Sequence, residues 1–264
     1  MSAPLKISIA GLGTVGAGTL ELLKAQSEVL AVRCGRKLDV VAVSARERKK
    51  DRGVDLSNIT WFDDPVTMAH DADADVFVEL IGGSEGAAKD ACVAAIQAGR
   101  HVVTANKALI ALHGTELALA AESAGVALAY EAAVAGGIPI IKALREGLVG
   151  NRIESLHGIL NGTCNYILTT MRETGRAFDD VLSEAQELGY AEADPSFDID
   201  GVDAAHKLAI LTSVAFGTVV DFESMHVEGI RHVASEDIEY AGEFGYRIKL
   251  LGISEQTEIG IQQR

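Results

Sequence analysis

The sequence has few of the residues that mark several common classes of protein. Its 264 residues include three cysteines, Cys34, Cys92 and Cys164, which lie far apart and form no C-x-x-C motif. This excludes a framework of paired disulfides and fits a reducing compartment. Proline occurs 4 times against 27 glycines, a balance that indicates tight backbone turns and not disorder. The 7 histidines are scattered without the spacing of zinc ligands.

Positive charge and long apolar runs are also scarce. Lys and Arg number 23 against 38 Asp and Glu, which gives a formal net charge of −15. This disfavours a nucleic-acid-binding protein, because phosphate backbones require a clustered basic surface. Residues 1–10 show no signal peptide, and no apolar run is long enough to span a bilayer. We therefore expect a cytoplasmic protein that binds neither nucleic acid nor membranes.

The first half alternates short apolar segments with segments of helical period. Helices are predicted at 14–30, at 85–98 and up to about residue 123, and strands at 6–10, 38–43, 58–62, 75–81, 101–104 and 126–130. Strands separated by helices form parallel sheets with right-handed crossovers. The predicted fold class is therefore α/β, with a Rossmann-type doubly wound parallel sheet that forms a dinucleotide-binding domain over residues 1–135.

The pattern changes after residue 135. The second half mixes predicted helices at 138–147, 164–172, 178–188 and 202–215 with predicted strands at 153–160, 225–227 and 246–253. This mixed order indicates an α+β domain. We expect residues 136–264 to form a substrate-binding and catalytic domain.

A glycine-rich turn stands between the first strand and the first helix. Gly11-Leu12-Gly13-Thr14-Val15-Gly16 is a G-x-G-x-x-G motif, in which the glycines allow a tight turn, a close approach of the backbone to a pyrophosphate, and close packing of helix on strand. The N–H groups of the helix N-terminus then face the phosphates. A purely structural turn is the alternative, but the position at the start of a βαβ series predicts a dinucleotide site. Gly83, after the strand at 75–81, is expected to contribute to it.

The end of the second strand bears on which dinucleotide binds. Sites that prefer NAD usually carry Asp or Glu there, whereas this strand runs into Val43-Ser44-Ala45-Arg46-Glu47-Arg48-Lys49-Lys50. Arg46 could face the 2′-phosphate of NADP, or the segment could be an ordinary solvated basic turn. The sequence favours NADP, with NAD also used.

Lys107 occupies a position where a cation is unexpected. It follows Thr104-Ala105-Asn106 at the point where a strand ends and a helix begins. That point belongs to the ligand edge of a doubly wound sheet, although the N-terminus of a helix disfavours positive charge. A lysine there could meet a reacting oxygen near the nicotinamide, or it could be a surface lysine at a helix start.

Five carboxylates fall between Glu192 and Asp203, shortly before Lys207. A calcium-binding loop does not fit, because Lys207 would take the place of the bidentate glutamate. Asp203 and Lys207 are four residues apart and share one face of a helix. By itself this predicts only an ordinary salt bridge, but apolar neighbours on both sides indicate a largely buried helix, where a lysine requires a reason.

Together these residues resemble homoserine dehydrogenase. The likeness includes the glycine-rich turn, residues 104–107, residues 131–139 (E-A-A-V-A-G-G-I-P), residues 160–166 (L-N-G-T-C-N-Y) and residues 189–207. It implies an NAD(P)-dependent interconversion of L-homoserine and L-aspartate 4-semialdehyde in threonine, methionine and isoleucine biosynthesis, by a homodimer or homotetramer. Family chains normally continue past the counterpart of Arg264, so the resemblance also implies that a C-terminal continuation is missing.

The resemblance assigns roles to particular residues. Lys207 would be the catalytic acid/base, and Lys107 would assist at the reacting oxygen and contact the nicotinamide. Glu192 and Asp203 match substrate-binding carboxylates, and Gly189 matches a position beside the cofactor. A sodium ion would be held by the side chain of one glutamate and by backbone carbonyls, which suit a hard cation; the matching positions are Glu131, Val134, Gly136 and Ile138.

Two alternatives stay open on the sequence. A different NAD(P)-dependent amino-acid dehydrogenase would share the glycine-rich turn but would have no need of the set of Glu192, Asp203 and Lys207. A truncated, non-catalytic dinucleotide-binding module would bind the cofactor without turnover. The dehydrogenase interpretation requires the acidic loop and Lys107 to face each other across a cleft.

Overall fold

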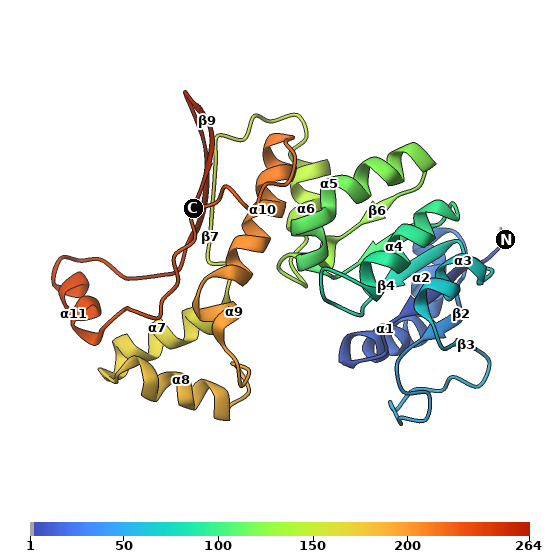
Figure 1. Cartoon of the computed structure of the whole chain (residues 1–264), viewed down its shortest axis with the longest axis horizontal. Helices are drawn as coiled ribbons and strands as arrows, with labels where there is room; N and C mark the ends of the chain where they lie inside the picture. The colour runs from blue at the N-terminus through green and yellow to red at the C-terminus, as the bar shows by residue number, and fades with distance from the viewer. Residues whose placement is uncertain (1–2) are drawn as a thin grey trace. The chain divides into compact units, whose positions relative to one another are not determined.

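The computed structural model describes residues 3–264. The chain divides into two compact units, unit 1 over Met1–Ile141 and unit 2 over Lys142–Arg264. Figure 1 shows unit 1 in blue to green and unit 2 in green to red. The predicted assignment of a cofactor domain before residue 136 and a substrate domain after it concerns function, and it stays a prediction.

Unit 1 contains a six-stranded sheet in the order β3-β2-β1-β4-β5-β6. All neighbouring strands are parallel. The strands are β1 (Leu5–Ala10), β2 (Leu38–Ser44), β3 (Thr60–Phe62), β4 (Val76–Glu79), β5 (His101–Thr104) and β6 (Leu128–Ala129). This is the order of a Rossmann sheet, whose ligand crevice opens at the carboxyl ends of the strands where the order reverses, here between β1 and β4. The predicted fold class is confirmed.

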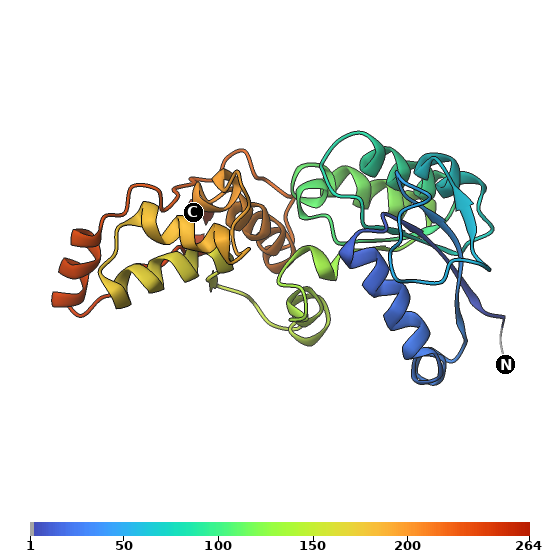
Figure 2. The ribbon, with the colours of Figure 1, turned by 90° about the horizontal axis from the view of Figure 1, so that it is seen from below.

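Helices cover both faces of this sheet, as Figure 2 shows with the blue α1 on one side and the teal and green α4 and α5 on the other. The helices are α1 (Thr14–Ala25), α2 (Ser27–Cys34), α3 (Pro65–Asp71), α4 (Ala87–Gln97) and α5 (Lys107–Ala124). On one face Phe77 packs with Met68 and Leu109, and on the other Ile9 packs with Leu20. The single helix predicted at 14–30 is in fact α1 and α2. The two share no continuous buried face, because α1 buries Leu20 whereas α2 buries none of its residues.

Unit 2 joins a bundle of helices to an antiparallel sheet in the order β7-β8-β9. Its strands are β7 (Ser155–Gly158), β8 (Gly252–Thr257) and β9 (Gly260–Gln263). Its main helices are α7 (Gly162–Thr174), α8 (Phe178–Glu187), α9 (Ser196–Ile199), α10 (Val202–Phe216) and α11 (Ser235–Glu243). Three short helical segments precede them in the chain. They are the 3-10 turn η1 (Glu131–Ala133), which still belongs to unit 1, α6 (Ile140–Lys142) and the π-helical turn η2 (Ala143–Gly147). One apolar cluster joins α7 and α8, and another packs α10 beside Met225. The predicted α+β character is confirmed.

Two strands predicted in the second half are wrong in whole or in part. Residues 225–227 form no strand, and Met225 packs against Leu208 of α10 instead. In the stretch predicted at 246–253 the strand begins only at Gly252, while Ile248 and Leu250 pack on the cluster of α7 and α8. In both places apolar side chains enter the core from backbone that pairs with no strand among residues 3–264. Alternating hydrophobicity indicates burial there, not pairing.

The described residues also bear on the excluded classes. No helix within residues 3–264 is long and apolar enough to cross a membrane. The three cysteines are free, with Cys34 exposed and Cys92 and Cys164 buried. The absence of a disulfide framework in the sequence is thus reflected in the structure.

Candidate functional site

The glycine-rich turn joins β1 to α1 at the carboxyl edge of the sheet. Gly11 has φ +96°, and a Cβ atom there would lie 2.3 Å from the carbonyl oxygen of Leu80. A Cβ atom on Gly16 would lie 2.0 Å from the carbonyl oxygen of Gly11. Gly13, by contrast, is exposed and has open space around its Cα. Packing therefore requires the outer two glycines, and the middle one leaves the backbone accessible.

The N-terminus of α1 faces the same open space. The helix begins at Thr14 with Gly13 as its N-cap, and no side chain among residues 3–264 caps this end. The first N–H groups of a helix have no intrahelical acceptor and attract anions. Together with the open position of Gly13, this arrangement fits the pyrophosphate of a dinucleotide.

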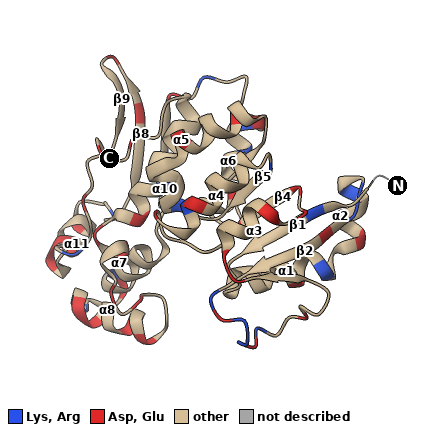
Figure 3. Cartoon of the chain, turned by 45° about the vertical axis from the view of Figure 1, so that its right-hand side comes forward, with Lys and Arg blue, Asp and Glu red and all other residues tan. Residues whose placement is uncertain are grey.

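A cavity of about 430 Å³ adjoins the turn. Its lining comes from the carboxyl ends of β1, β2 and β4 and from the loop after β2, and includes Gly11, Gly13, Ser44, Arg46, Lys50 and Leu80. Figure 3 shows the Lys and Arg residues of this loop in blue. The structure therefore brings Arg46, which is exposed, to the same cavity as the glycine-rich turn.

Arg52 connects that loop to the glycine-rich turn. Its Nε donates to the carbonyl oxygen of Leu12 at 3.1 Å, and its two terminal nitrogens donate to the carbonyl oxygens of Lys50 (2.8 Å) and Glu47 (2.6 Å). The guanidinium carbon lies 5.7 Å from the ring centre of Trp61, within the range of a cation–π contact. Sequence reasoning missed Arg52, because it is one of several basic residues in a row and its main acceptor is 40 positions away.

A buried carboxylate organises the ends of β4 and β5. Glu79 is fully buried, and its Oε1 accepts from the N–H groups of Ile81 (2.7 Å) and Gly82 (2.9 Å). Its Oε2 accepts from the hydroxyl of Thr104 at 2.5 Å. The same hydroxyl oxygen accepts from the N–H of Asn106 at 2.9 Å. Glu79 therefore ties the loop after β4 to the start of α5, and sequence reasoning missed it because a strand-end glutamate resembles a surface residue.

Asn106 connects the loop that contains Gly83 to the start of α5, where Lys107 lies. Asn106 is the N-cap of α5: its Oδ1 accepts from the N–H of Leu109 at 3.1 Å, and its Nδ2 donates to the carbonyl oxygen of Gly83 at 2.6 Å. Lys107 is the first residue of that helix and is half-buried. The two predicted positions, Gly83 and Lys107, thus belong to one hydrogen-bonded edge of unit 1.

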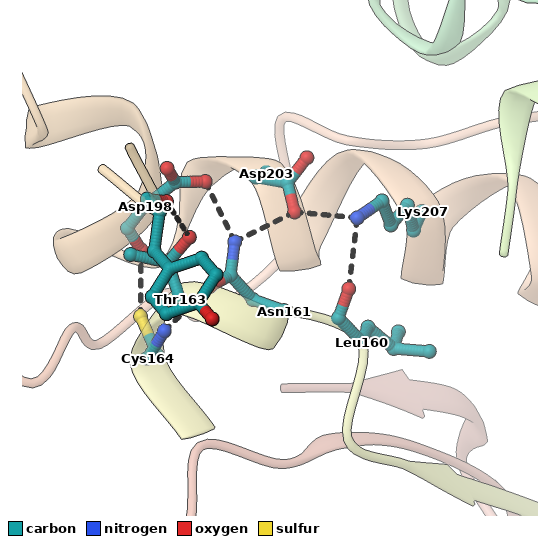
Figure 4. Close-up of polar contacts among 8 residues, drawn as sticks. Leu160, Asn161, Thr163, Cys164, Asp198, Asp203 and Lys207 are labelled. Atoms are coloured by element: carbon teal, nitrogen blue, oxygen red, sulfur yellow. Dashed lines mark hydrogen bonds and ion pairs between the residues drawn. The ribbon is translucent and has the colours of Figure 1, made fainter. Parts of the chain in front are cut away.

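In unit 2, the predicted pair of Asp203 and Lys207 lies on one face of α10 (Figure 4). Nζ of Lys207 lies 2.6 Å from Oδ2 of Asp203 and donates to the carbonyl oxygen of Leu160 at 2.8 Å. Only 3% of the Asp203 side chain and 18% of the Lys207 side chain are exposed. A buried ion pair persists where further hydrogen bonds satisfy its members, and here these come from the segment before α7.

Asn161 supplies those further hydrogen bonds. Its Nδ2 donates to Oδ2 of Asp203 at 2.8 Å and to Oδ1 of Asp198 at 2.7 Å, and its Oδ1 accepts from the N–H of Cys164 at 2.8 Å. The thiol of Cys164 contacts the carbonyl oxygen of Asp198 at 3.2 Å. Burial, and then the nearby carboxylates of Asp198 and Asp203, raise the pKa of this thiol to about 12. Asn161 belongs to the motif at 160–166 and Asp198 to the five carboxylates noted in the sequence, but neither was predicted as a site residue.

The other two predicted residues of this region lie on its surface. Gly189 follows α8 with φ +75° and is exposed. Glu192 is exposed on the turn between α8 and α9, where its carbonyl oxygen accepts from Nε2 of Gln186 at 3.0 Å. The structure thus brings Asp203 and Lys207 into direct contact, while Glu192 stands on the loop that leads to them.

The predicted sodium ligands lie around η1 in unit 1. Oε1 of Glu131 accepts from the N–H of Ile141 at 3.1 Å. The backbone then turns tightly through Ala135, at φ +50°, with the N–H of Ile138 bonded to the carbonyl oxygen of Ala135 at 2.8 Å. No group of three or more His, Cys, Asp or Glu side chains within residues 3–264 could hold a metal ion. A cation at this turn would therefore depend on carbonyl oxygens, and an all-oxygen donor set fits a hard cation.

Comparison with known proteins agrees with this arrangement. The family model described as the NAD-binding domain of homoserine dehydrogenase matches residues 11–131, and the model described as homoserine dehydrogenase matches residues 139–263. A homoserine dehydrogenase of Pseudomonas aeruginosa is 52% identical over 263 residues, which is 99% of this chain and 59% of that protein. The chain belongs to the homoserine dehydrogenase family. It spans about three fifths of the length of that relative and of the similar protein from Neisseria gonorrhoeae.

Solved structures of homoserine dehydrogenases share the fold. The crystal structure of the enzyme from Thiobacillus denitrificans has a TM-score of 0.95 and 52% identity, and the match covers 99% of this chain and 60% of that one. A hyperthermophilic archaeal homoserine dehydrogenase in complex with NADPH has a TM-score of 0.82 and 28% identity, with coverage of 99% and 81%. The likeness therefore extends through both units of the chain.

Proposed function

We propose that this chain carries the cofactor-binding and catalytic parts of a homoserine dehydrogenase. The reaction is the reversible oxidation of L-homoserine to L-aspartate 4-semialdehyde with NADP, or less favourably NAD. The observation that carries the proposal is the buried pair of Lys207 and Asp203, held at 2.6 Å within the unit that the catalytic family model matches. We also propose that the reaction serves threonine, methionine and isoleucine biosynthesis and that the protein forms a homodimer or homotetramer, as the resemblance to the family implies.

Unit 1 would hold the dinucleotide, whose nicotinamide ring accepts or supplies the hydride. The open backbone at Gly13 and the N–H groups of Thr14, Val15 and Gly16 fit the pyrophosphate. Arg46, on the wall of the same cavity, would bind a 2′-phosphate, and the archaeal relative was solved with NADPH. Lys107 would contact the nicotinamide side of the cofactor, and Gly83 and Gly189 are further proposed cofactor-binding positions.

The proposed roles in proton transfer and amino-acid binding belong to Lys207, Asp203 and Glu192 of unit 2 and to Lys107 of unit 1. During reduction, the protonated amine of Lys207 would donate a proton to the reacting oxygen. During oxidation, the same nitrogen in its neutral form would accept the proton of the substrate's hydroxyl. Lys107 stabilises negative charge on the reacting oxygen. Asp203 and Glu192 bind the ammonium group of the amino acid, since carboxylates are its natural partners.

A sodium ion is proposed at the turn after η1. Its ligands would be the side chain of Glu131 and the backbone carbonyls of Val134, Gly136 and Ile138. The oxygen donors of this turn suit such an ion, and its role would be to fix the conformation of the segment that precedes unit 2.

The test is an absorbance assay at the reduced-nicotinamide band with L-homoserine and NADP or NAD. We expect Lys207→Ala to lower kcat by about 10²-fold or more, the usual contribution of general acid–base catalysis, while NADP still binds. The matched control is Lys142→Ala, which removes a lysine from an exposed i,i+4 pair with Glu146 and should leave kcat unchanged. A kcat of Lys207→Ala close to that of the wild type would overturn the assignment.

Two further results separate the alternatives. If the wild-type chain binds NADP but shows no turnover, it acts as a dinucleotide-binding module. If it oxidises another amino alcohol faster than L-homoserine, it is a different amino-acid dehydrogenase. For the cofactor, Arg46→Ala should reduce the preference for NADP over NAD. An unchanged preference would show that Arg46 belongs to an ordinary solvated basic turn and does not bind the 2′-phosphate.

A further inference from the structure

The side-chain nitrogen and oxygen of Asn161 both form hydrogen bonds with other residues of unit 2 (Figure 4). The side chain is buried, with 3% of the residue exposed. Its oxygen accepts from the N–H of Cys164 at the start of α7, and its nitrogen donates to the carboxylates of Asp198 and Asp203. The two carboxylates come from different helices, α9 and α10. One amide group therefore joins the beginnings or ends of three helices.

The two acceptors of this amide are both negatively charged. Like charges brought together in a poorly hydrated place repel each other, unless a donor or a cation lies between them. Lys207 contacts Oδ2 of Asp203, the same oxygen that accepts from Asn161. The position of Nζ of Lys207 is therefore coupled, through one shared oxygen atom, to the orientation of the Asn161 amide.

We propose that Asn161 is the positioning residue of this site: its two N–H groups hold Asp198 and Asp203 together, and through Asp203 they aim the Lys207 amine. This inference rests on the proposed function for its catalytic consequence. Its structural part, the donation by Asn161 to two carboxylates, can be tested whether or not the chain turns over.

A purely structural role for Asn161 is the rival explanation, because Asn161 is also the N-cap of α7. The substitution Asn161→Asp separates the two roles. Aspartate caps a helix as well as asparagine does, and its negative charge is favourable at a helix N-terminus. A capping role therefore predicts a variant that is normal near neutral pH and weaker in acid, where the new carboxyl is protonated.

The donor role predicts the opposite dependence on pH. At about pH 8 the new carboxylate would add a third negative charge beside Asp198 and Asp203 and would have no hydrogen to donate. In acid the new carboxyl group gains a proton and can donate again to one of them. A carboxyl that keeps its proton more readily in the folded than in the unfolded state makes stability rise as the pH falls.

The groups that face this position define what else could titrate. They are Asp198 of α9, Asp203 and Lys207 of α10, and Cys164 of α7. Asp200, which is bound by Arg231, also acts on the Cys164 thiol through its charge. The pKa of Cys164 is raised to about 12, so its thiol does not change charge in the range tested. Measuring each variant as its difference from wild type at the same pH removes the titration that both proteins share.

The experiment follows thermal unfolding and kcat/KM between about pH 5.5 and pH 8. Trp61, the single tryptophan, lies in unit 1, so the transition seen by circular dichroism but not by its fluorescence belongs to unit 2. We expect Asn161→Asp to lower the melting temperature of unit 2 by roughly 5 °C or more at the higher pH. At least half of this deficit, and of the loss in kcat/KM, should disappear at the lower pH.

Two further variants complete the test. Asn161→Ser keeps a capping oxygen but has no amide donors and no charge, so its deficit should be the same at both pH values. Asn165→Asp adds a carboxylate four positions after Asn161, about one helical turn further along α7, where Nζ of Lys249 lies 2.6 Å from Oδ1 of Asn165. It should leave kcat/KM and its pH dependence unchanged.

The outcomes are distinct. A unit 2 that melts normally in Asn161→Asp near pH 8, or a deficit that grows in acid, would overturn the proposal in favour of capping alone. If the wild type shows no turnover, the proposed function fails, but the acid recovery of the melting temperature still decides the role of the amide. If turnover is normal and kcat/KM of Asn161→Asp equals that of the wild type at every pH, the coupling to Lys207 is refuted.

Discussion

Removal of the buried Glu79 carboxylate should lower the free energy of unfolding of unit 1 by more than removal of an ordinary surface glutamate would. Glu79 accepts three hydrogen bonds, from the N–H groups of Ile81 and Gly82 and from the hydroxyl of Thr104. In Glu79→Ala these three donors lose their acceptor. An unsatisfied buried donor costs about 1–3 kcal/mol, while loss of the charge removes part of the original cost of burying it. We expect a net loss of about 3–5 kcal/mol in the free energy of unfolding.

The variant Glu79→Gln, which has nearly the shape of the original side chain, gives a comparison for the stability loss of Glu79→Ala. Glu79→Gln keeps an oxygen for the two N–H groups and places an NH₂ group against the hydroxyl oxygen of Thr104. That oxygen already accepts from the N–H of Asn106, and its second lone pair can accept from the new amide. The cost of Glu79→Gln should therefore be about 1–2 kcal/mol.

Guanidinium unfolding followed by fluorescence of Trp61 measures this directly, because the single tryptophan lies on β3 of the same unit. Stabilities should fall in the order wild type, Glu79→Gln, Glu79→Ala, with the m-value unchanged. The exposed Glu122 of α5 gives a control, since Glu122→Ala should shift stability by less than about 0.5 kcal/mol. A loss below about 1 kcal/mol in Glu79→Ala would refute the reasoning.

Three further predictions concern other parts of the chain. Arg52→Ala should weaken NADP binding roughly 10-fold in a fluorescence titration, because the loop with Arg46 loses its hydrogen bond to Leu12. Arg52→Lys should not restore binding, since lysine lacks the guanidinium fork. Full binding by either variant would contradict the role of Arg52 in holding this loop. Iodoacetamide at neutral pH should label the exposed Cys34 and spare the buried Cys92 and Cys164, because burial raises the pKa of both thiols. Mass spectrometry of the alkylated peptides measures the labelling. Early labelling of Cys164 would contradict this prediction. Hydrogen bonds from Arg176 and Tyr166 lower the pKa of Glu184, so its contribution to stability is present above the unfolded-state pKa and is lost as the pH falls through the lower folded-state pKa. The melting temperature of wild type should therefore exceed that of Glu184→Gln at neutral pH and converge with it in acid, and a constant difference would contradict this.

Features with a local cause could be predicted from the sequence. The spacing of the glycine-rich turn, the apolar strands of unit 1 and the i,i+4 relation of Asp203 and Lys207 each depend on residues a few positions apart. The parallel sheet follows because strands alternate with helices. For these features, short-range rules of backbone geometry and burial were sufficient.

The remaining site residues depend on contacts that are distant along the chain. Asn161 is 37 residues from Asp198 and 42 from Asp203, and Glu79 is 25 from Thr104. Nothing in the local composition of these segments indicates which polar side chain will be buried with a partner. The stretch at 246–251 was misassigned for a related reason, because its apolar side chains indicate burial but not whether a strand lies beside it.

The placement of Asp203 and Lys207 on one helix has a consequence for how the sequence around them can vary. One turn of α10 sets the spacing of Asp203 and Lys207, so no loop movement can separate them. Glu192 and Asp198 stand outside that helix, on the turn and the short α9 that precede it. Insertions between residues 189 and 195, ahead of Asp198, can therefore change the segment around Glu192 while Asp203 and Lys207 keep their spacing. The chain therefore combines a residue pair of fixed spacing with a preceding segment that is open to evolutionary change.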